Sequence, residues 1–138
     1  MSSNTPKLTV DAVIILNRKI VLIERKNPPF QEKFALPGGF VDIGETTEEA
    51  VVREALEETG LAIEIVKLLG VYSEPSRDPR GHTVSIVYLA MGKGVPRADS
   101  DAKGVHLFDL QDIPEMAFDH NEIIENARCD IYGVLSRM

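Results

Sequence analysis

Apolar runs separated by short polar segments predict the strands of this chain. Residues 8–16 and 19–25 are strand-like and flank the polar pair Asn17-Arg18, a spacing typical of a β-hairpin. Three further segments have strand patterns, the last of them as a short edge strand: residues 62–72, 83–91 and 104–109. The polar residues 92–101 are expected to form a turn-rich connection. The pattern therefore predicts a sheet that is built around an N-terminal hairpin.

The segment that follows residue 45 has the signals of a helix at both ends. Thr46 is followed three residues later by Glu49, which fits a capping box. Thr59-Gly60 offers a stop, because glycine readily adopts the left-handed backbone that ends many helices. The sequence therefore predicts a helix at residues 47–59.

A second helix is predicted close to the end of the chain. Asp119 with Glu122 fits a capping box at its start, which favours a structural role for both carboxylates. The apolar residues that follow recur on one face of a helix: Ile124, Ala127, Ile131, Val134 and Leu135. A face of this kind is expected to cover the sheet.

Composition narrows the class of protein. With 138 residues, 43% of them hydrophobic, we expect residues 1–138 to form a single domain with a real core. Asp and Glu number 22 against 15 Lys and Arg, and the net charge of −7 argues against nonspecific binding to nucleic acid or anionic membrane. Cys129 is alone, so an intrachain disulfide is excluded, and no apolar run approaches the roughly 20 residues of a membrane span. The start of the chain lacks a signal-peptide pattern, and the cytoplasm is the expected compartment.

The first predicted helix carries more carboxylate on one face than a helix needs. Glu54, Glu57 and Glu58 stand at i, i+3 and i+4, so their Cβ atoms are expected to lie roughly 5–6 Å apart. Arg53 can reach Glu49 and Glu57, but one guanidinium cannot neutralise the whole set. A hard divalent cation such as Mg²⁺ or Mn²⁺ can, because it prefers oxygen ligands. For the three glutamates alone, a solvated acidic helix face is the more common explanation.

The longer string around this helix is more specific than the acidic face. Gly39, five residues, Glu45, seven residues and then Arg-Glu-Ala-Leu-Glu-Glu-Thr-Gly-Leu at 53–61 resemble the Nudix box at every defined position. The resemblance implies an α/β fold, namely a Nudix-type α/β/α sandwich with a mixed sheet. It also implies metal-dependent hydrolysis of a nucleoside diphosphate that is linked to another moiety.

The same resemblance implies roles for the residues of the box. The metal ligands are expected to be the Gly38 carbonyl, Glu54, Glu57 and Glu58. The catalytic residues are expected to be Arg53, Glu54 and Glu57. Glu54 either binds metal or takes the proton of the attacking water, and spacing leaves that alternative open. Glu45 is expected to support the loop and the Arg53 side chain rather than to bind metal.

Selection of the substrate is expected to come from loops outside the box. The proline-stiffened segment 75–82 resembles a segment of the ADP-ribose pyrophosphatase branch of the family, and its Arg77 and Arg80 suit bidentate contacts with a diphosphate or a terminal ribose. We expect both arginines to be exposed loop charges. Arg25 lies at the end of a strand where related enzymes often place a substrate-facing arginine, although a surface charge is the alternative. Glu115 is the candidate free carboxylate in a loop that related enzymes often hang over the metals.

The sequence thus favours a Nudix pyrophosphohydrolase that cuts ADP-ribose to AMP and ribose 5-phosphate with Mg²⁺ or Mn²⁺. One alternative is a pyrophosphohydrolase of oxidised nucleoside triphosphates, which shares the box and differs in the pocket. The other is a module that binds ADP-ribose without cleaving it, which the intact set of carboxylates disfavours. The expected partner is a small nucleotide, not nucleic acid or membrane. The resembling branch often forms dimers, so a homodimer is an open alternative to a monomer.

Overall fold

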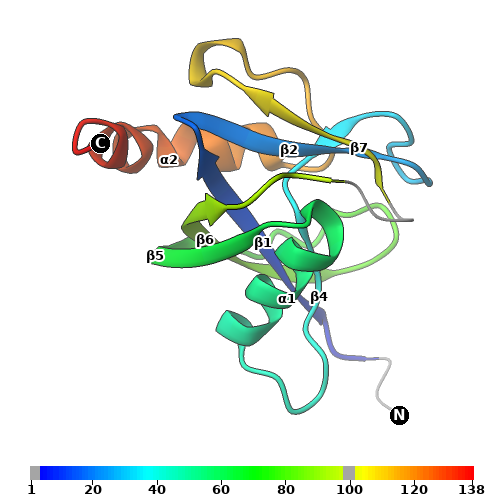
Figure 1. Cartoon of the computed structure of the whole chain (residues 1–138). Coiled ribbons are helices and arrows are strands. Elements are labelled where there is room, and N and C mark those ends of the chain that lie inside the picture. The colour runs from blue at the N-terminus through cyan, green and yellow to red at the C-terminus, as the bar shows by residue number, and fades with distance from the viewer. Residues whose placement is uncertain (1–3, 98–101) are drawn as a thin grey trace.

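The computed structural model describes residues 4–97 and 102–138, and runs of strands precede each of its two long helices (Figure 1). The strands are β1 (Lys7–Leu16), β2 (Lys19–Arg25), β3 (Phe34–Ala35), β4 (Gly38–Phe40), β5 (Ala62–Tyr72), β6 (Thr83–Lys93) and β7 (Ala102–Phe108). The helices are α1 (Thr47–Thr59), a short 3₁₀ turn η1 (Leu110–Asp112) and α2 (His120–Leu135).

All these strands belong to one mixed sheet. The central path runs β3-β2-β1-β6-β5, with β4 paired to β1 and β7 paired to β2. β1 and β6 are parallel, and the other pairs are antiparallel. The sheet therefore places β1 at its centre, in contact with the hairpin partner β2, with β6 and with the glycine-rich β4.

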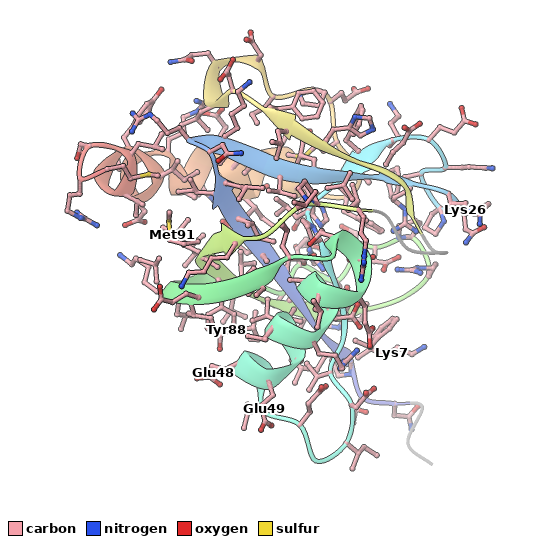
Figure 2. All side chains as sticks on the ribbon, viewed as in Figure 1. Lys7, Lys26, Glu48, Glu49, Tyr88 and Met91 are labelled. Atoms are coloured by element: carbon pink, nitrogen blue, oxygen red, sulfur yellow. The ribbon has the colours of Figure 1, made fainter. Side chains whose placement is uncertain are left out.

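The two long helices cover opposite faces of this sheet (Figure 1). Val13 and Ile15 of β1 pack with Ile124 and Ile131 of α2, whereas the alternate β1 residues pack with α1. The helix residues on that second side are Ala50, Val51 and Ala55, and Tyr88 of β6 packs with them (Figure 2). The result is the predicted α/β/α sandwich, because successive residues of a strand point to opposite faces.

The local signals of the sequence predict α1 and the first hairpin correctly. The Thr46 hydroxyl accepts from the Glu49 amide at 3.0 Å, and the Glu49 carboxylate accepts from the Thr46 amide at 2.9 Å. Gly60 ends the helix in the left-handed region, at φ 75°. The hairpin turn is confirmed too, with Asn17 and Arg18 at φ 52° and 64°.

Other elements differ from the pattern-based expectation. The sequence analysis did not predict β3 and β4, because strands of two and three residues are too short to show a periodicity. β6 continues through Gly92 to Lys93, and residues 98–101 of the predicted connection lie outside the described residues. Neither long helix in the described ranges has the length and apolar character that crossing a bilayer requires.

Candidate active site

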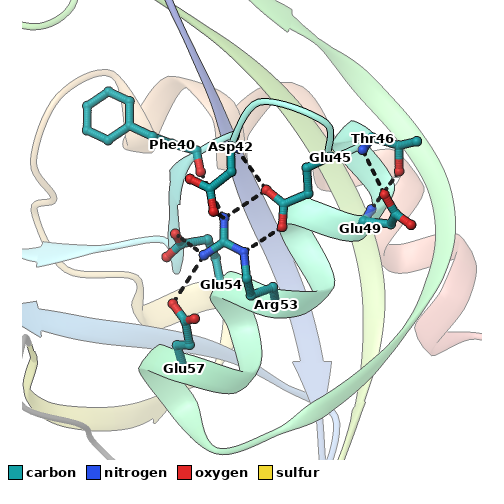
Figure 3. Close-up of polar contacts among 8 residues, drawn as sticks. All are labelled: Phe40, Asp42, Glu45, Thr46, Glu49, Arg53, Glu54 and Glu57. Carbon is teal, nitrogen blue, oxygen red and sulfur yellow. Dashed lines mark hydrogen bonds and ion pairs between the residues drawn. The ribbon is translucent and has the colours of Figure 1, made fainter.

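Arg53 of α1 is the centre of an ion-pair network (Figure 3). Its Nε and Nη2 donate to the two carboxylate oxygens of Glu45 at 2.5 and 2.9 Å. Its Nη1 donates to Glu54 at 2.9 Å and to Glu57 at 3.2 Å, and Nη2 also donates to the Phe40 carbonyl at 3.0 Å. One guanidinium thus joins the loop before α1, the end of β4 and the acidic face of the helix.

The electrostatics of this network differ from one carboxylate to the next. The hydrogen bonds from Arg53 lower the pKa of Glu45 to about 2, so Glu45 is a permanent anion at neutral pH. Burial raises the pKa of Glu54 above its usual value, although Arg53 opposes the shift. The side chain of Glu54 is 15% exposed and that of Glu57 is 55% exposed. The burial of Glu54 therefore favours its protonated form.

The two glycines of β4 allow the strand to approach α1 closely. The Gly38 amide donates to the Glu58 carboxylate at 2.7 Å. A Cβ atom added to Gly39 would lie 2.4 Å from Cδ of Glu54, and one added to Gly38 would lie 2.2 Å from the Val10 carbonyl oxygen. Any other residue at Gly38 would therefore push β4 away from β1, and any other residue at Gly39 would displace the Glu54 carboxylate.

The carboxylates of α1 are suitable ligands for a divalent cation, but they are not arranged as a finished site. Glu54 and Glu57 turn toward Arg53, and Glu58 turns toward the Gly38 amide. Within residues 4–97 and 102–138, no three Asp, Glu, His or Cys side chains form a ready-made metal cluster. The oxygen donors fit a hard cation, and the space left by the missing Cβ of Gly39 adjoins them.

A cavity of about 80 Å³, here called the inner cavity, lies beside this face. Glu58, Gly38 and Gly39 line one side of it, and Arg25 and Phe118 line another. The Arg25 Nε donates to the Pro29 carbonyl at 2.7 Å, and its guanidinium lies 5.1 Å from the centre of the Phe118 ring.

Arg80 brings a second cation to the same ring. Its guanidinium lies 5.8 Å from the centre of Phe118, and Asp78 holds it through hydrogen bonds of 3.1 and 2.8 Å. Burial and the nearby charge of Arg80 lower the pKa of Arg25. Two guanidinium groups on one aromatic ring favour an anionic ligand between them.

Arg77 differs from the exposed loop charge that we expected. It donates to both oxygens of Asp119 at 2.9 and 2.7 Å and to the Thr83 hydroxyl at 3.0 Å, and its side chain is only 5% exposed. The capping prediction for Asp119 is also wrong, since that side chain makes no cap hydrogen bond to α2. The buried ion pair with Arg77 occupies both of its oxygens.

Glu115 is not the free carboxylate that the sequence analysis expected. It accepts from Lys33 at 2.5 Å on the surface, and this bond lowers its pKa. It does not line the inner cavity.

The sequence analysis missed a buried pair at the floor of the inner cavity, Asp11 and His120. The Leu36 amide donates to Nδ1 of His120 at 3.0 Å, and Nε2 of His120 lies 3.7 Å from Asp11. The Ser85 hydroxyl donates to the other Asp11 oxygen at 2.5 Å. Burial raises the pKa of Asp11 to about 7 and lowers the pKa of His120 to about 3, so the imidazole is neutral and carries its proton on Nε2.

Comparison with known proteins agrees with this geometry. The sequence model of the NUDIX domain matches residues 5–127. The ADP-ribose pyrophosphatase of Methanocaldococcus jannaschii is 56% identical over 122 residues, which are 88% of this chain and 72% of that protein. A putative 8-oxo-dGTP diphosphatase of Bacillus subtilis is 46% identical over 72 residues, which are 51% of this chain and 46% of the relative.

A solved structure has the same fold over nearly the whole chain. The NUDIX domain of Shewanella oneidensis NrtR, complexed with ADP ribose, superposes with a TM-score of 0.80 at 32% identity. The match covers 93% of this chain and 90% of that one.

The burial of Arg77 generates a stability prediction. Arg77→Ala leaves the Asp119 carboxylate, which is only 17% exposed, charged and without its partner, so we expect a loss of about 3 kcal/mol in the free energy of unfolding. Lys67 and Asp130 form an ion pair that is exposed on both sides, so Lys67→Ala is expected to cost about 1 kcal/mol or less. Urea unfolding of the two variants measures the difference. Equal losses would show that the Arg77 pair is no more important to the fold than a surface ion pair.

The buried imidazole generates a pH prediction. The folded-state pKa of His120 is below its unfolded value of 6.5, so the unfolded chain gains a proton that the native state does not, and stability falls as pH decreases from about 6.5 toward 3. Between pH 7 and pH 5 this linkage amounts to about 2 kcal/mol. His120→Asn keeps an acceptor for the Leu36 amide but does not titrate.

The measurement is the free energy of unfolding in urea at both pH values. The wild-type protein is expected to lose about 2 kcal/mol more than His120→Asn, because the opposing titration of Asp11 is present in both. The same loss in both proteins would contradict a buried neutral His120.

Proposed function

The chain belongs to the Nudix family of hydrolases, and from this premise we propose that it hydrolyses ADP-ribose to AMP and ribose 5-phosphate. The observation that carries the proposal is the acidic face of α1, which Arg53 holds together, which lies against Gly38 and Gly39, and which adjoins the inner cavity lined by Arg25 and Arg80. The 56% identity to an ADP-ribose pyrophosphatase extends over 88% of this chain and supports the choice of substrate.

Nudix hydrolases generally need divalent metal ions, and here we propose Mg²⁺ or Mn²⁺. The residues that would hold the ion are Glu57, Glu58 and the Gly38 carbonyl. Bound there, such an ion would polarise a phosphoryl oxygen and lower the pKa of water. We assign to Glu54 the task of accepting the proton of the attacking water on a carboxylate oxygen, since its burial favours the protonated form. Arg53 orients that carboxylate, and Glu45 in turn fixes Arg53.

Arg25 and Arg80 are the proposed partners of the substrate's negative charge. Both guanidinium groups contact the Phe118 ring at the wall of the inner cavity, and both are well placed to meet a phosphate or the terminal ribose. Arg77 has a structural role in this proposal, because its guanidinium donates hydrogen bonds to Asp119 and Thr83. Glu115 has no role in this proposal, since it pairs with Lys33 away from the cavity.

A second candidate activity is pyrophosphohydrolysis of oxidised nucleoside triphosphates. The partial similarity to a putative 8-oxo-dGTP diphosphatase favours it, although that match covers only 51% of this chain. The box serves a diphosphate in either substrate, so the distinction depends on the cavities beside it.

A substrate comparison tests the proposed function. We expect ADP-ribose to be cut with a kcat/KM well above that for 8-oxo-dGTP in the presence of Mg²⁺ or Mn²⁺, and excess EDTA to abolish turnover. A higher kcat/KM for 8-oxo-dGTP would replace the assigned substrate with the second candidate. Binding of ADP-ribose by calorimetry without any turnover would indicate a sensing module.

Charge-neutral substitutions on α1 test the mechanism. Glu57→Gln and Glu58→Gln remove charge that binds the cation, and Glu54→Gln removes the proposed base, so each is expected to lower kcat by about 10²–10⁴-fold. Glu48→Gln is the matched control, since Glu48 lies in the exposed first turn of the same helix (Figure 2). Turnover of all three variants within about threefold of the parent would make the acidic face an ordinary solvated surface.

A further inference from the structure

A second cavity adjoins the inner one and has no assigned ligand. This outer cavity has a volume of about 440 Å³, against about 80 Å³ for the inner cavity. Lys7, Gly81 and His82 line it, and Phe40, Asp78, Arg80 and Thr83 line both cavities. Sites for small organic ligands typically have volumes of about 300–1,000 Å³, so the outer cavity alone has the size for a nucleoside.

Phe40 stands between the outer cavity and the acidic face of α1. Its carbonyl accepts from Arg53 at 3.0 Å, and Figure 3 shows its ring pointing away from the carboxylates. The residue before it, Gly39, faces the Glu54 carboxylate so closely that no Cβ fits between them. A group stacked on the Phe40 ring would therefore hold an attached phosphate next to the acidic face.

The Phe40 ring is available for such stacking. It is 42% exposed although it is a large apolar side chain, and Lys7 lies over it with Nζ 5.6 Å from the ring centre. An exposed aromatic ring with a cation beside it suits a nucleobase, whose flat face stacks on the ring and whose phosphate attracts the cation.

The cation that both cavities share is Arg80. Asp78, which has a buried side chain, fixes it, so its guanidinium is held at the boundary rather than free to leave. Two adjoining cavities with an arginine at their boundary suit a diphosphate ester that has a bulky group at each end.

We propose that the outer cavity binds the adenosine half of the substrate by stacking on Phe40, while the inner cavity receives the ribose phosphate half. This inference rests on the proposed function, and it adds the orientation of the substrate. The narrow inner cavity, with His120 and Asp11 at its floor, offers polar partners for sugar hydroxyls but little volume for a base.

Binding of the two products tests this orientation without relying on turnover. Calorimetry with Mg²⁺ measures the Kd of AMP and of ribose 5-phosphate for each variant. Phe40→Leu removes the stacking ring and is expected to weaken AMP about tenfold while leaving ribose 5-phosphate within about twofold. Phe118→Leu, at the wall of the inner cavity, is expected to weaken ribose 5-phosphate binding about tenfold while leaving AMP binding within about twofold.

Two further variants complete the test. Phe40→Trp keeps an aromatic surface and is expected to retain AMP binding, which separates stacking from a fold defect. Tyr132→Leu is the matched control, because this aromatic residue of α2 is 44% exposed and lines neither cavity. It is expected to change neither Kd.

Each other outcome overturns the orientation. If Phe40→Leu lost ribose 5-phosphate binding instead, the ribose phosphate half would lie in the outer cavity. If AMP binding were unchanged in Phe40→Leu, the outer cavity would not be part of the substrate site. Hydrolysis of ADP-ribose by the wild-type protein is measured separately. If hydrolysis occurs and Phe40→Leu has no effect, the inference fails and the proposed function stands. If no hydrolysis occurs, the proposed function fails.

Discussion

The site depends on one guanidinium that holds mutually repelling carboxylates together. At an effective dielectric constant of about 20, two unit charges 4 Å apart interact by about 4 kcal/mol, so clustered glutamates on one helix face need a compensating cation. Arg53 contacts Glu45, Glu54 and Glu57, but it contacts only Glu45 through both carboxylate oxygens. Arg53 is therefore anchored on the loop side, so Arg53 would stay in place if Glu57 turned to the proposed cation.

The glycine pair of β4 buries part of the acidic face, because it lets this strand lie close to α1. β4 is hydrogen-bonded to the central strand β1, so its distance from α1 is set by the sheet rather than by the loop. Gly39 lets the strand reach the Glu54 carboxylate, and Gly38 lets it lie against Val10 and Asp11. The burial that raises the pKa of Glu54 follows from this close approach, because desolvation disfavours the charged form. The backbone packing at Gly39 and the proton affinity of Glu54 are thus linked.

The sequence predicts the parts of the protein whose causes are local. Thr46, Glu49 and Gly60 lie within one helix and its ends, so the bounds of α1 follow from capping and backbone geometry alone. Asp119 shows the limit of such signals. Its spacing to Glu122 fits a capping box, yet Arg77, 42 residues earlier in the chain, takes both of its oxygens. A bidentate charge-assisted bond in a buried setting outweighs a single bond to a backbone amide.

No local pattern in the sequence indicated that Asp11 and His120 form a pair, because the two residues lie far apart in the chain. Asp11 is the one acidic residue in an otherwise apolar stretch of β1, and His120 begins α2, so each alone has an ordinary structural explanation. Only the folding of α2 over the sheet brings Nε2 of His120 to 3.7 Å from Asp11 beneath the glycine turn. The acidic face of α1 lies in one continuous segment of the sequence, whereas the cavities that we propose to select the substrate combine β1, β2, β4, the loop before β6 and the start of α2. The class of reaction could therefore be predicted from the sequence, whereas the proposal for how the substrate lies could be made only from the fold.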